Sequence, residues 1–480
     1  MPPTLVLFLW VLLLLALLWL DPAQNAKTSK ALWIPVVWLF IEGSRLPSQW
    51  INPGGLATAQ SMEDGNPLDR VIFLVLILLA IGVLFSRSFS FSRFVARNTA
   101  LNCLLLFALL SVLWSDFPFV VFKRWIRDCG TYLVTLVVLT DRSRLEAITT
   151  VLRRLAYILL PLSIVLDRYF IQLSRQYDGW TGTFTNVGVT TSKNMLGLLC
   201  LVSGLFFLWD TITRWPQRRQ RQTKRILAVN VVFLALSIWL LQTAKSTTST
   251  VCLVLGSFVI LVSQSTFIRR RPGILKTLIP ASFCVYLLLD FVFGLNGSMA
   301  QAVGKDPTLT DRTKIWTFLL GMHTNPFIGT GYQSFWLGSR LEYFWNASGE
   351  GHINEAHNGF LEVYLELGLI GIVLLIGFLI ASYRTIYKRL TSSRSFAVFG
   401  LAVWLVLVFY NMSEAAFEAG LMYALFLMVA VAAPERTAHR VGIPNVVGKD
   451  GASAAGRNEM SPRVARLSIE PAARRDDDSW

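Results

Sequence analysis

Long apolar runs separated by short polar segments dominate the chain. The runs do not alternate apolar and polar residues as barrel strands do, and many approach the roughly 20 residues that a helix needs to cross a bilayer. The pattern predicts an all-α fold, a polytopic membrane helical bundle of about 11–14 transmembrane helices. The thirteen predicted helices are 4–20, 29–42, 69–86, 98–115, 127–140, 150–166, 187–209, 226–243, 249–267, 274–294, 364–386, 395–412 and 416–433.

Basic residues gather in alternate connections between these runs. Residues 214–225 carry six Lys or Arg in twelve positions, and 268–276 is similarly basic. Cytoplasmic loops of membrane proteins collect Lys and Arg, so both segments are predicted to be cytoplasmic. The segments 87–97, 142–154 and 384–394 fall on the same side. The loops predicted on the opposite, extracytoplasmic side are 43–68, 116–126, 167–186, 244–248, 295–363 and 413–415.

The predicted membrane domain, residues 1–433, contains a large periplasmic loop, residues 295–363. Within that loop, Asp311 to Met322 are predicted to form a short helix. The first apolar run lacks a positive n-region and an obvious cleavage site, so we expect a retained helix and not a signal peptide. Residues 434–480 are rich in Ala, Arg, Ser and Pro without periodicity, which predicts a disordered cytoplasmic tail.

Composition agrees with a membrane protein. Charged residues make up 15% of the chain, against about 25% in soluble domains. The net charge of +15 is explained by the basic loops, and without a nucleic-acid-binding module we expect no nucleic-acid partner. The five cysteines lie in or beside apolar runs without ligand spacing, so we expect neither a disulfide framework nor a zinc site.

Four groups of polar residues are candidates for chemistry on the extracytoplasmic side. His357 precedes a helix that re-enters the membrane, where a neutral imidazole can accept a hydroxyl proton near neutral pH; the plainer interpretation is an interfacial histidine that hydrogen-bonds a carbonyl. Arg312 can donate two parallel hydrogen bonds to phosphate oxygens. The plainer interpretation is an arginine that is solvated or paired with Asp311.

The remaining candidates are lysines and arginines on a side that usually lacks them. Lys245 lies in a predicted turn between two helices. Either a diphosphate partner or extension of the side chain to the membrane interface would explain a lysine there. Lys123, Arg124 and Arg127 stand at a helix entrance, where anionic headgroups or a phosphorylated lipid substrate would explain them. Together these residues describe a cationic surface with one histidine, suited to a lipid-borne diphosphate. Without paired carboxylates at metal-ligand spacing, a metal-independent mechanism is favoured.

Several motifs occur in the order found in one known family. His357 and Asn358, followed by nine residues and Gly368, resemble the His-(Asn/Ser/Gln)-x9-Gly signature of O-antigen ligases and related polysaccharide polymerases. Upstream, the run DRTKIW followed by Pro326, Gly329, Gly331 and Phe335 resembles the large-loop pattern of that family. The segments LLQTAKSTTST, TGTFTNVGVTTSKNMLG and LWSDFPFVVFKRWI also resemble family segments, the last of them in the exopolysaccharide-polymerase branch. The resemblance covers roughly residues 30–433.

This resemblance implies a metal-independent, inverting glycosyltransferase with a GT-C-like membrane fold and no cofactor. It implies that His357 activates the acceptor hydroxyl, that Arg312 binds the diphosphate of an undecaprenyl-diphosphate-linked glycan, and that Lys193 and Asn358 belong to the substrate site. Lys245 stands where the family commonly has arginine, and the segment before Lys193 departs from the family spacing. We predict that Arg124 also stabilises the leaving group.

The acceptor remains open at this point. A ligase passes the glycan to lipid A core, whereas a polymerase extends another lipid-linked glycan, and the local resemblance leans toward the polymerase. Expected surroundings are the bacterial inner membrane, with a periplasmic active face and other polysaccharide assembly proteins as partners. The rival class is a polysaccharide transporter or lipid-linked glycan flippase, against which stand the scarcity of charged residues in the membrane runs and the absence of repeats.

Overall fold

The computed structural model describes residues 2–21, 28–53, 63, 65–87, 90–178, 183–293, 310–348 and 353–432. Contacts divide the chain into two units, Met1–Thr437 and Ala438–Trp480. The second unit, and with it the predicted disordered tail, lies outside the described residues. The same holds for residues 295–309 and 349–352 of the predicted periplasmic loop.

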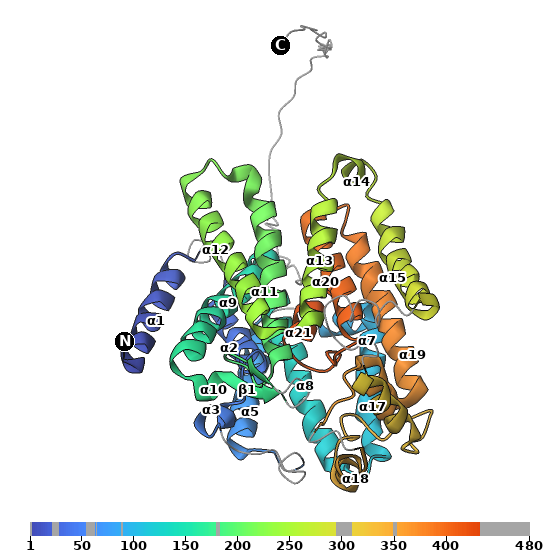
Figure 1. The fold of residues 1–480 in the computed structure, drawn as a ribbon. Coiled ribbons are helices and arrows are strands. Elements are labelled where there is room, and N and C mark those ends of the chain that lie inside the picture. Colours follow the sequence, from blue (N-terminus) through green and yellow to red (C-terminus); the bar gives the residue numbers. More distant parts are fainter. Residues whose placement is uncertain are drawn as a thin grey trace, which may run out of the picture. The chain divides into compact units, whose positions relative to one another are not determined.

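The first unit is a bundle of helices with one small hairpin (Figure 1). Its helices before the hairpin are α1 (Pro3–Trp19), η2 (Lys30–Leu32), α2 (Trp33–Glu42), α3 (Pro47–Ile51), α5 (Pro67–Ser86), α6 (Phe91–Arg97), α7 (Thr99–Leu110), η3 (Ser111–Leu113), α8 (Pro118–Leu139), α9 (Arg144–Tyr169) and α10 (Ile171–Ser174). The hairpin is β1 (Arg175–Asp178) and β2 (Thr183–Asn186). After it come α11 (Lys193–Arg214), η4 (Trp215–Gln217), α12 (Arg221–Ala244), α13 (Thr247–Val262), α14 (Thr266–Arg270), α15 (Ile274–Phe293), α17 (Thr310–Gly321), α18 (Gly338–Ser348), α19 (Gly359–Lys388), α20 (Arg394–Tyr410) and α21 (Leu421–Ala430).

The predicted all-α, polytopic membrane class is confirmed. Among the described residues, five helices are long and apolar enough to cross a membrane, namely α5, α9, α11 with η4, α12 and α19. The pair α6 and α7–η3, bent by 94°, adds a sixth if it forms one span, and several apolar helices are shorter. Each of the thirteen predicted segments overlaps a helix, because lipid offers the backbone no other hydrogen-bond partner.

Two local predictions were wrong. The segment 116–126 is not a loop, because α8 begins at Pro118, a residue suited to the first turn of a helix. Lys123, Arg124 and Arg127 therefore lie within α8. The predicted loop 167–186 contains the antiparallel hairpin β1–β2, in which Tyr177 and Phe184 pair across the strands with ring centroids 5.6 Å apart.

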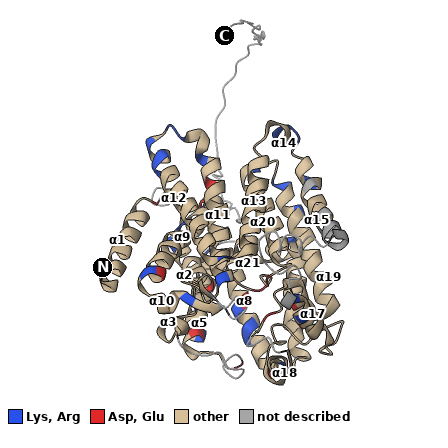
Figure 2. Ribbon diagram, in the orientation of Figure 1, with Lys and Arg blue, Asp and Glu red and all other residues tan. Residues whose placement is uncertain are grey.

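The basic connections gather at one end of the bundle. Figure 2 shows Lys and Arg where α11 joins α12 and at α14, opposite the end that carries α3, α17 and α18. Arg394 Nη2 donates to the Ser263 carbonyl at 2.9 Å, which joins the segment before α20 to the segment before α14. Arg87 pairs with Asp141 at 3.0 Å, which joins two further basic segments. This grouping is the arrangement that the alternating basic loops predict.

At the other end, the predicted loop helix forms as α17, and its apolar side builds a separate small core. Ile315 and Leu319 are buried against Phe335, Trp336 and other residues of the loop. The loop then docks on the membrane helices: Trp114 Nε1 donates to the Ile328 carbonyl at 3.0 Å, and the Tyr332 hydroxyl donates to Asp128 at 2.7 Å. The loop is therefore packed against the bundle through both apolar and polar contacts.

A break in α19 receives the Pro-Gly-Gly segment of the large loop. Gly368 has φ +64° inside this helix, and its neighbours find backbone partners in the loop. Leu369 N donates to the Pro326 carbonyl at 2.9 Å, and Gly331 N donates to the Glu366 carbonyl at 2.8 Å. A Cβ on Gly329 would overlap the Glu366 backbone, so the segments meet only because both glycines lack side chains. The Pro-Gly-Gly motif of the large loop and the glycine of the histidine signature therefore pack directly against each other.

We predict that Gly368→Ala destabilises the protein by at least about 1 kcal/mol, because alanine disfavours positive φ. Its Cβ would also overlap the backbone of Phe327 and Ile328. The midpoint of thermal inactivation in detergent should fall. The matched control is Gly377→Ala in the same helix, where a Cβ meets nothing within 4 Å and no loss is expected. Equal midpoints for the two variants would contradict this account.

Candidate functional site

The segment that carries His357 is held from several sides. Trp316 Nε1 donates to the Ala356 carbonyl at 2.7 Å, and Trp345 Nε1 donates to the Ile353 carbonyl at 2.7 Å. The Glu362 carboxylate accepts a hydrogen bond from Ala356 N and another from Trp336 Nε1, at 2.9 Å for the latter. Such surroundings fix the backbone of His357 at φ +49°, a conformation that non-glycine residues adopt only under constraint.

His357 and Arg312 are brought together by one carboxylate, that of Glu414. His357 Nδ1 lies 2.8 Å from Glu355 Oε1 and 3.4 Å from Glu414 Oε2. The other oxygen of Glu414 lies 2.8 Å from Arg312 Nη2, while Arg312 Nη1 donates to the Ser413 carbonyl. The Glu414 side chain is 5% exposed, whereas those of His357 and Arg312 keep 21% and 22%. We call Glu355, His357, Glu414 and Arg312 the His–Arg cluster.

The segment between α20 and α21 places Glu414. Gly359 N, at the start of α19, donates to the carbonyls of Asn411 and Glu414 at 2.9 and 3.0 Å. Asn411 Oδ1 accepts from Ala416 N at 2.7 Å, which closes the turn. A Cβ on Gly359 would overlap the Asn411 side chain, so glycine at this position allows the turn to sit directly against the helix that follows His357.

In the His–Arg cluster, each charged group stabilises the charged form of its oppositely charged neighbours. Burial by itself lowers the pKa of His357, but its contacts with Glu355 and Glu414 outweigh this effect and raise the pKa from 6.5 to about 10. Burial alone would raise the pKa of Glu414, and its contacts with His357 and Arg312 lower it instead. At neutral pH the resting imidazole is therefore a cation. This differs from the neutral imidazole expected from the sequence, because no nearby carboxylate was foreseen.

The turn that carries Lys245 packs against the start of α11, which carries Lys193. Lys245 is exposed at the turn after α12, with φ +53°. The next residue, Ser246, lies 3.5 Å from Asn194 Oδ1, and a Cβ on Gly197 would overlap Ser246. The Thr248 and Ser413 hydroxyls are 2.9 Å apart, and Ser413 is the residue whose carbonyl binds Arg312. The structure thus brings this turn next to the His–Arg cluster.

Arg124 lies in a neighbouring polar group on α8. Its Nη1 donates to the Gln333 carbonyl, while Arg127 contacts Asp128 at 3.0 Å and Gln333 Oε1 at 3.2 Å. The Glu418 carboxylate interacts electrostatically with Asp128, Arg127 and Arg124 of this group, and also with Glu355 of the His–Arg cluster. Arg124 and the His–Arg cluster therefore share one charged neighbour, Glu418.

Asn358 has a clear structural role. It is the N-cap of α19, and its Oδ1 accepts hydrogen bonds from Phe360 N and Leu361 N at 3.0 and 3.1 Å. This bond pattern satisfies two backbone donors at the helix start. The family-signature residue after the histidine thus fixes where the helix begins, and its predicted contact with substrate stays a prediction.

Sequence reasoning missed the carboxylates. Glu355, Glu414 and Glu362 complete the cluster and its support, yet none was singled out. A signal existed in Glu414 and Glu418, two acidic residues within a short connection between apolar runs. Of the residues that the structure describes, Glu355, His357 and Glu414 also have metal-ligand spacing, with donor atoms within 4.8 Å of one another. Arg312 already neutralises Glu414, which disfavours a divalent cation beside it.

Comparison with known proteins finds a similar family for the middle of the chain. Residues 182–376 match the model of the O-antigen ligase family. That range contains Lys193, Lys245, Arg312, His357 and Asn358, whereas Arg124 and Glu414 lie outside it. This match supports a likeness to O-antigen ligases and related polymerases.

A curated relative agrees with this family assignment. The exopolysaccharide production protein ExoQ of Rhizobium meliloti (strain 1021) is 28% identical over 327 residues, which cover 62% of this chain and 68% of the relative. Members of an O-antigen ligase/polymerase-like family are glycosyltransferase-like enzymes of the membrane, and lipid-linked glycans are the substrates that the family implies. The chain is accordingly a multi-pass membrane protein with an O-antigen ligase/polymerase-type function.

Proposed function

We propose that this chain is a bacterial inner-membrane glycosyltransferase that joins undecaprenyl-diphosphate-linked glycans on the periplasmic side. The observation that carries the proposal is the Glu414 carboxylate, which holds an accessible imidazole and an accessible guanidinium side by side. A base and a diphosphate-binding cation are the two groups that transfer from a lipid diphosphate requires. The family match supports the substrate class.

His357 is the general base in this proposal. Its Nδ1 faces Glu355 and Glu414, which orient the ring and stabilise the imidazolium formed when it takes the proton of the acceptor hydroxyl. The oxygen of that hydroxyl attacks the anomeric carbon of the donor with inversion. Since the pKa of His357 is about 10 in the resting site, the base form is a minority at neutral pH. We infer that acceptor binding displaces Glu355, whose side chain is 42% exposed.

Arg312 stabilises the departing lipid diphosphate. The bond from the anomeric carbon to the diphosphate oxygen breaks, and negative charge grows on that oxygen, where cations lower the barrier. Lys245 on the neighbouring turn, Lys193 at the start of α11 and Arg124 on α8 are further cations assigned to the diphosphate in this proposal. Arg312 pairs with Glu414, one of the three residues with metal-ligand spacing, so the proposed mechanism uses this cation in place of a metal and needs no cofactor.

The proposed orientation follows from the two ends of the bundle. The basic connections lie at one end and α17 and α18 at the other (Figure 2). Because cytoplasmic loops collect Lys and Arg, the end with α17 and α18 is periplasmic in this proposal. The acceptor is a second lipid-linked glycan, which makes the chain a polymerase, since the curated relative is an exopolysaccharide production protein. Lipid A core is the acceptor of the alternative ligase.

Glu355 offers a test of the base through pH. A base works in its deprotonated form, so the rate rises as pH rises through the pKa of His357. Glu355 raises that pKa, and Glu355→Gln should lower it. We therefore expect the alkaline rise of the pH–rate profile to move to lower pH, with a rate at pH 7 equal to or above wild type. A rate that instead falls at neutral pH would mean that His357 acts as a cation.

The proposed function is tested by reconstitution. The purified full chain is placed in liposomes with an undecaprenyl-diphosphate-linked oligosaccharide, alone or with lipid A core, and products are separated by size. Longer lipid-linked glycan indicates a polymerase, and glycan on lipid A core indicates a ligase, with the same yield in EDTA. Movement of the unchanged lipid-linked glycan across the bilayer, without a new product, would favour the transporter or flippase.

A further inference from the structure

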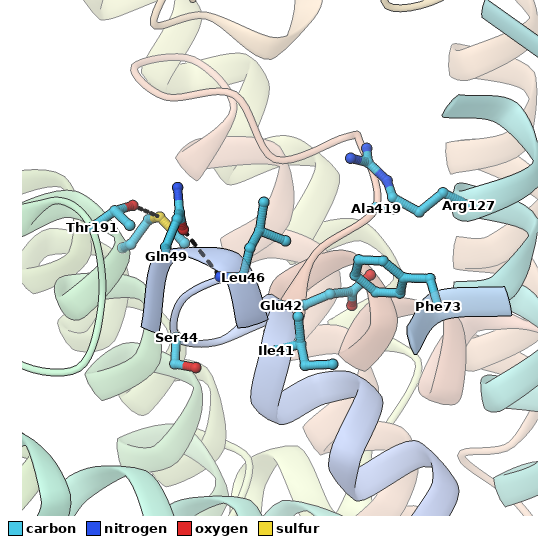
Figure 3. A pocket seen from close by; sticks show the side chains of 10 residues that line it. Ile41, Glu42, Ser44, Leu46, Gln49, Phe73, Arg127, Thr191 and Ala419 are labelled. Atoms are coloured by element: carbon cyan, nitrogen blue, oxygen red, sulfur yellow. Dashed lines mark hydrogen bonds between the residues drawn. The ribbon is translucent and has the colours of Figure 1, made fainter. Parts of the chain in front are cut away.

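A cavity of about 250 Å³ lies between α2, α3, α5, α8 and the start of α11 (Figure 3). The polar side chains in its wall are Glu42, Ser44, Gln49, Arg127 and Thr191. Phe73 supplies an aromatic ring next to Glu42 (Figure 3). None of the residues to which the proposed function gives a role in transfer belongs to this wall, so the cavity needs an explanation of its own.

One carboxylate oxygen of Glu42 is hydrogen-bonded, and the other is buried without a partner among the described residues. Trp38 Nε1 donates to Thr131 Oγ1 at 3.1 Å, and that hydroxyl donates to Glu42 Oε1 at 2.7 Å. Glu42 Oε2 is buried, and no hydrogen-bond partner for it is found among the described residues. A buried acceptor without a partner is costly, so a donor that enters the cavity would be bound strongly.

The wall excludes several classes of ligand. A phosphate would bring negative charge next to the Glu42 carboxylate, and a metal ion would meet the guanidinium of Arg127. An alkyl chain would leave the buried Glu42 oxygen unpaired. What remains is a small neutral group that presents hydroxyls at its edges and C–H groups on its faces. Drug-sized ligands occupy cavities of about 300–1,000 Å³, so 250 Å³ suits a single sugar ring.

The cavity lies within reach of the His–Arg cluster. Ala419 lines it, and Glu414 precedes Ala419 by five positions in the same connection between α20 and α21. Five residues span at most about 18 Å when extended, which bounds the separation to the length of a short oligosaccharide. Arg127 also contacts Gln333 of the large loop at 3.2 Å. A glycan held in the cavity can thus extend toward His357.

We propose that this cavity binds one sugar ring of the glycan substrate, with Glu42 Oε2 accepting a hydrogen bond from a ring hydroxyl. The inference rests on the proposed function and adds to it a subsite for a neutral sugar. The ring belongs either to the donor glycan or to the acceptor glycan, and both sources share this chemistry. Glu42 binds and does not react, so its loss changes affinity and leaves the chemical step intact.

The test measures initial rates of the reconstituted full chain while donor and acceptor concentrations are varied separately. Glu42→Gln and Glu42→Ala should raise KM for one substrate at least about 10-fold, with kcat within about twofold of wild type. A rise for the donor or for the acceptor identifies the source of the ring. Leu46→Trp fills the cavity from another wall and should raise the same KM. Glu146→Gln, an exposed carboxylate at the start of α9, is the control and should change neither.

A binding titration separates this inference from the proposed function. The probe is the free oligosaccharide repeat, followed by saturation-transfer NMR on the detergent-solubilised chain. Binding that Glu42→Gln weakens at least about 10-fold supports the cavity even if no transfer product forms. Unchanged KM values in a stably folded Glu42→Gln variant, a loss confined to kcat, or no binding of the repeat by wild type would each overturn the inference.

Discussion

Replacing His357 with alanine is expected to reduce glycan product by about 10²–10⁴-fold, the range that a positioned general base contributes. The imidazole is the group of the His–Arg cluster that can take a hydroxyl proton, and Glu355 and Glu414 orient it. Because the side chain is 21% exposed and belongs to a connecting segment, its loss should leave the helical bundle intact. The measurement is initial rate in reconstituted liposomes, with chain length of the product followed by gel electrophoresis.

His323→Ala is the matched control for this variant. His323 is exposed after α17 and has no part in the cluster, so its replacement should leave the rate within about twofold of wild type. Gel filtration in detergent confirms that both variants are folded. Normal product from a stably folded His357→Ala chain would refute the general-base assignment and leave Arg312 as the remaining element of the mechanism.

Arg312→Lys is expected to be nearly as damaging as Arg312→Ala, with kcat lowered about 10²–10³-fold in both, the usual effect of removing a donor to developing negative charge. The guanidinium uses two nitrogens at once: Nη2 contacts Glu414 and Nη1 the Ser413 carbonyl. A lysine ammonium is a point charge that cannot hold this fork and still present parallel donors to a diphosphate. The measurement is kcat and KM for the lipid-linked donor.

Arg340→Lys provides a control for the exchange itself. Arg340 pairs with Asp116 at 2.8 Å, and its side chain is 24% exposed, close to the value for Arg312. A surface pair of this kind contributes little, so no more than a twofold change of rate is expected. If Arg312→Lys retained most of its activity while Arg312→Ala lost it, the positive charge alone would suffice, and two-point binding of the diphosphate would be wrong.

Much of the fold follows from sequence because it depends on local composition and on the surrounding solvent. Each apolar run long enough for lipid became a helix, since a helix satisfies its own backbone hydrogen bonds without partners from elsewhere. The helix α17 was predicted from the spacing of Ile315 and Leu319, which a helix places on one side. The start of α8 was missed because its charged residues interrupt the apolar signal.

The candidate site was predicted only in part. His357 and Arg312 were identified as one site by the order of family motifs, and the structure brings them together. Glu414 was not identified, because its role arises from a turn that packs on the first residue of α19. Likewise, Gly368 was recognised as a motif residue, but the insertion of the Pro326–Gly331 segment into the helix break was not foreseen.

By itself, the sequence determined that this protein is a set of membrane helices, and it identified His357 and Arg312 as candidates for its chemistry. Only the tertiary structure decided which carboxylates surround them, and therefore that the resting imidazole carries a proton. The physical reason is the distance along the chain over which each property is determined. Hydropathy and helix formation depend on residues within a few turns, whereas the pKa of a side chain depends on charges that distant segments bring within about 4–6 Å.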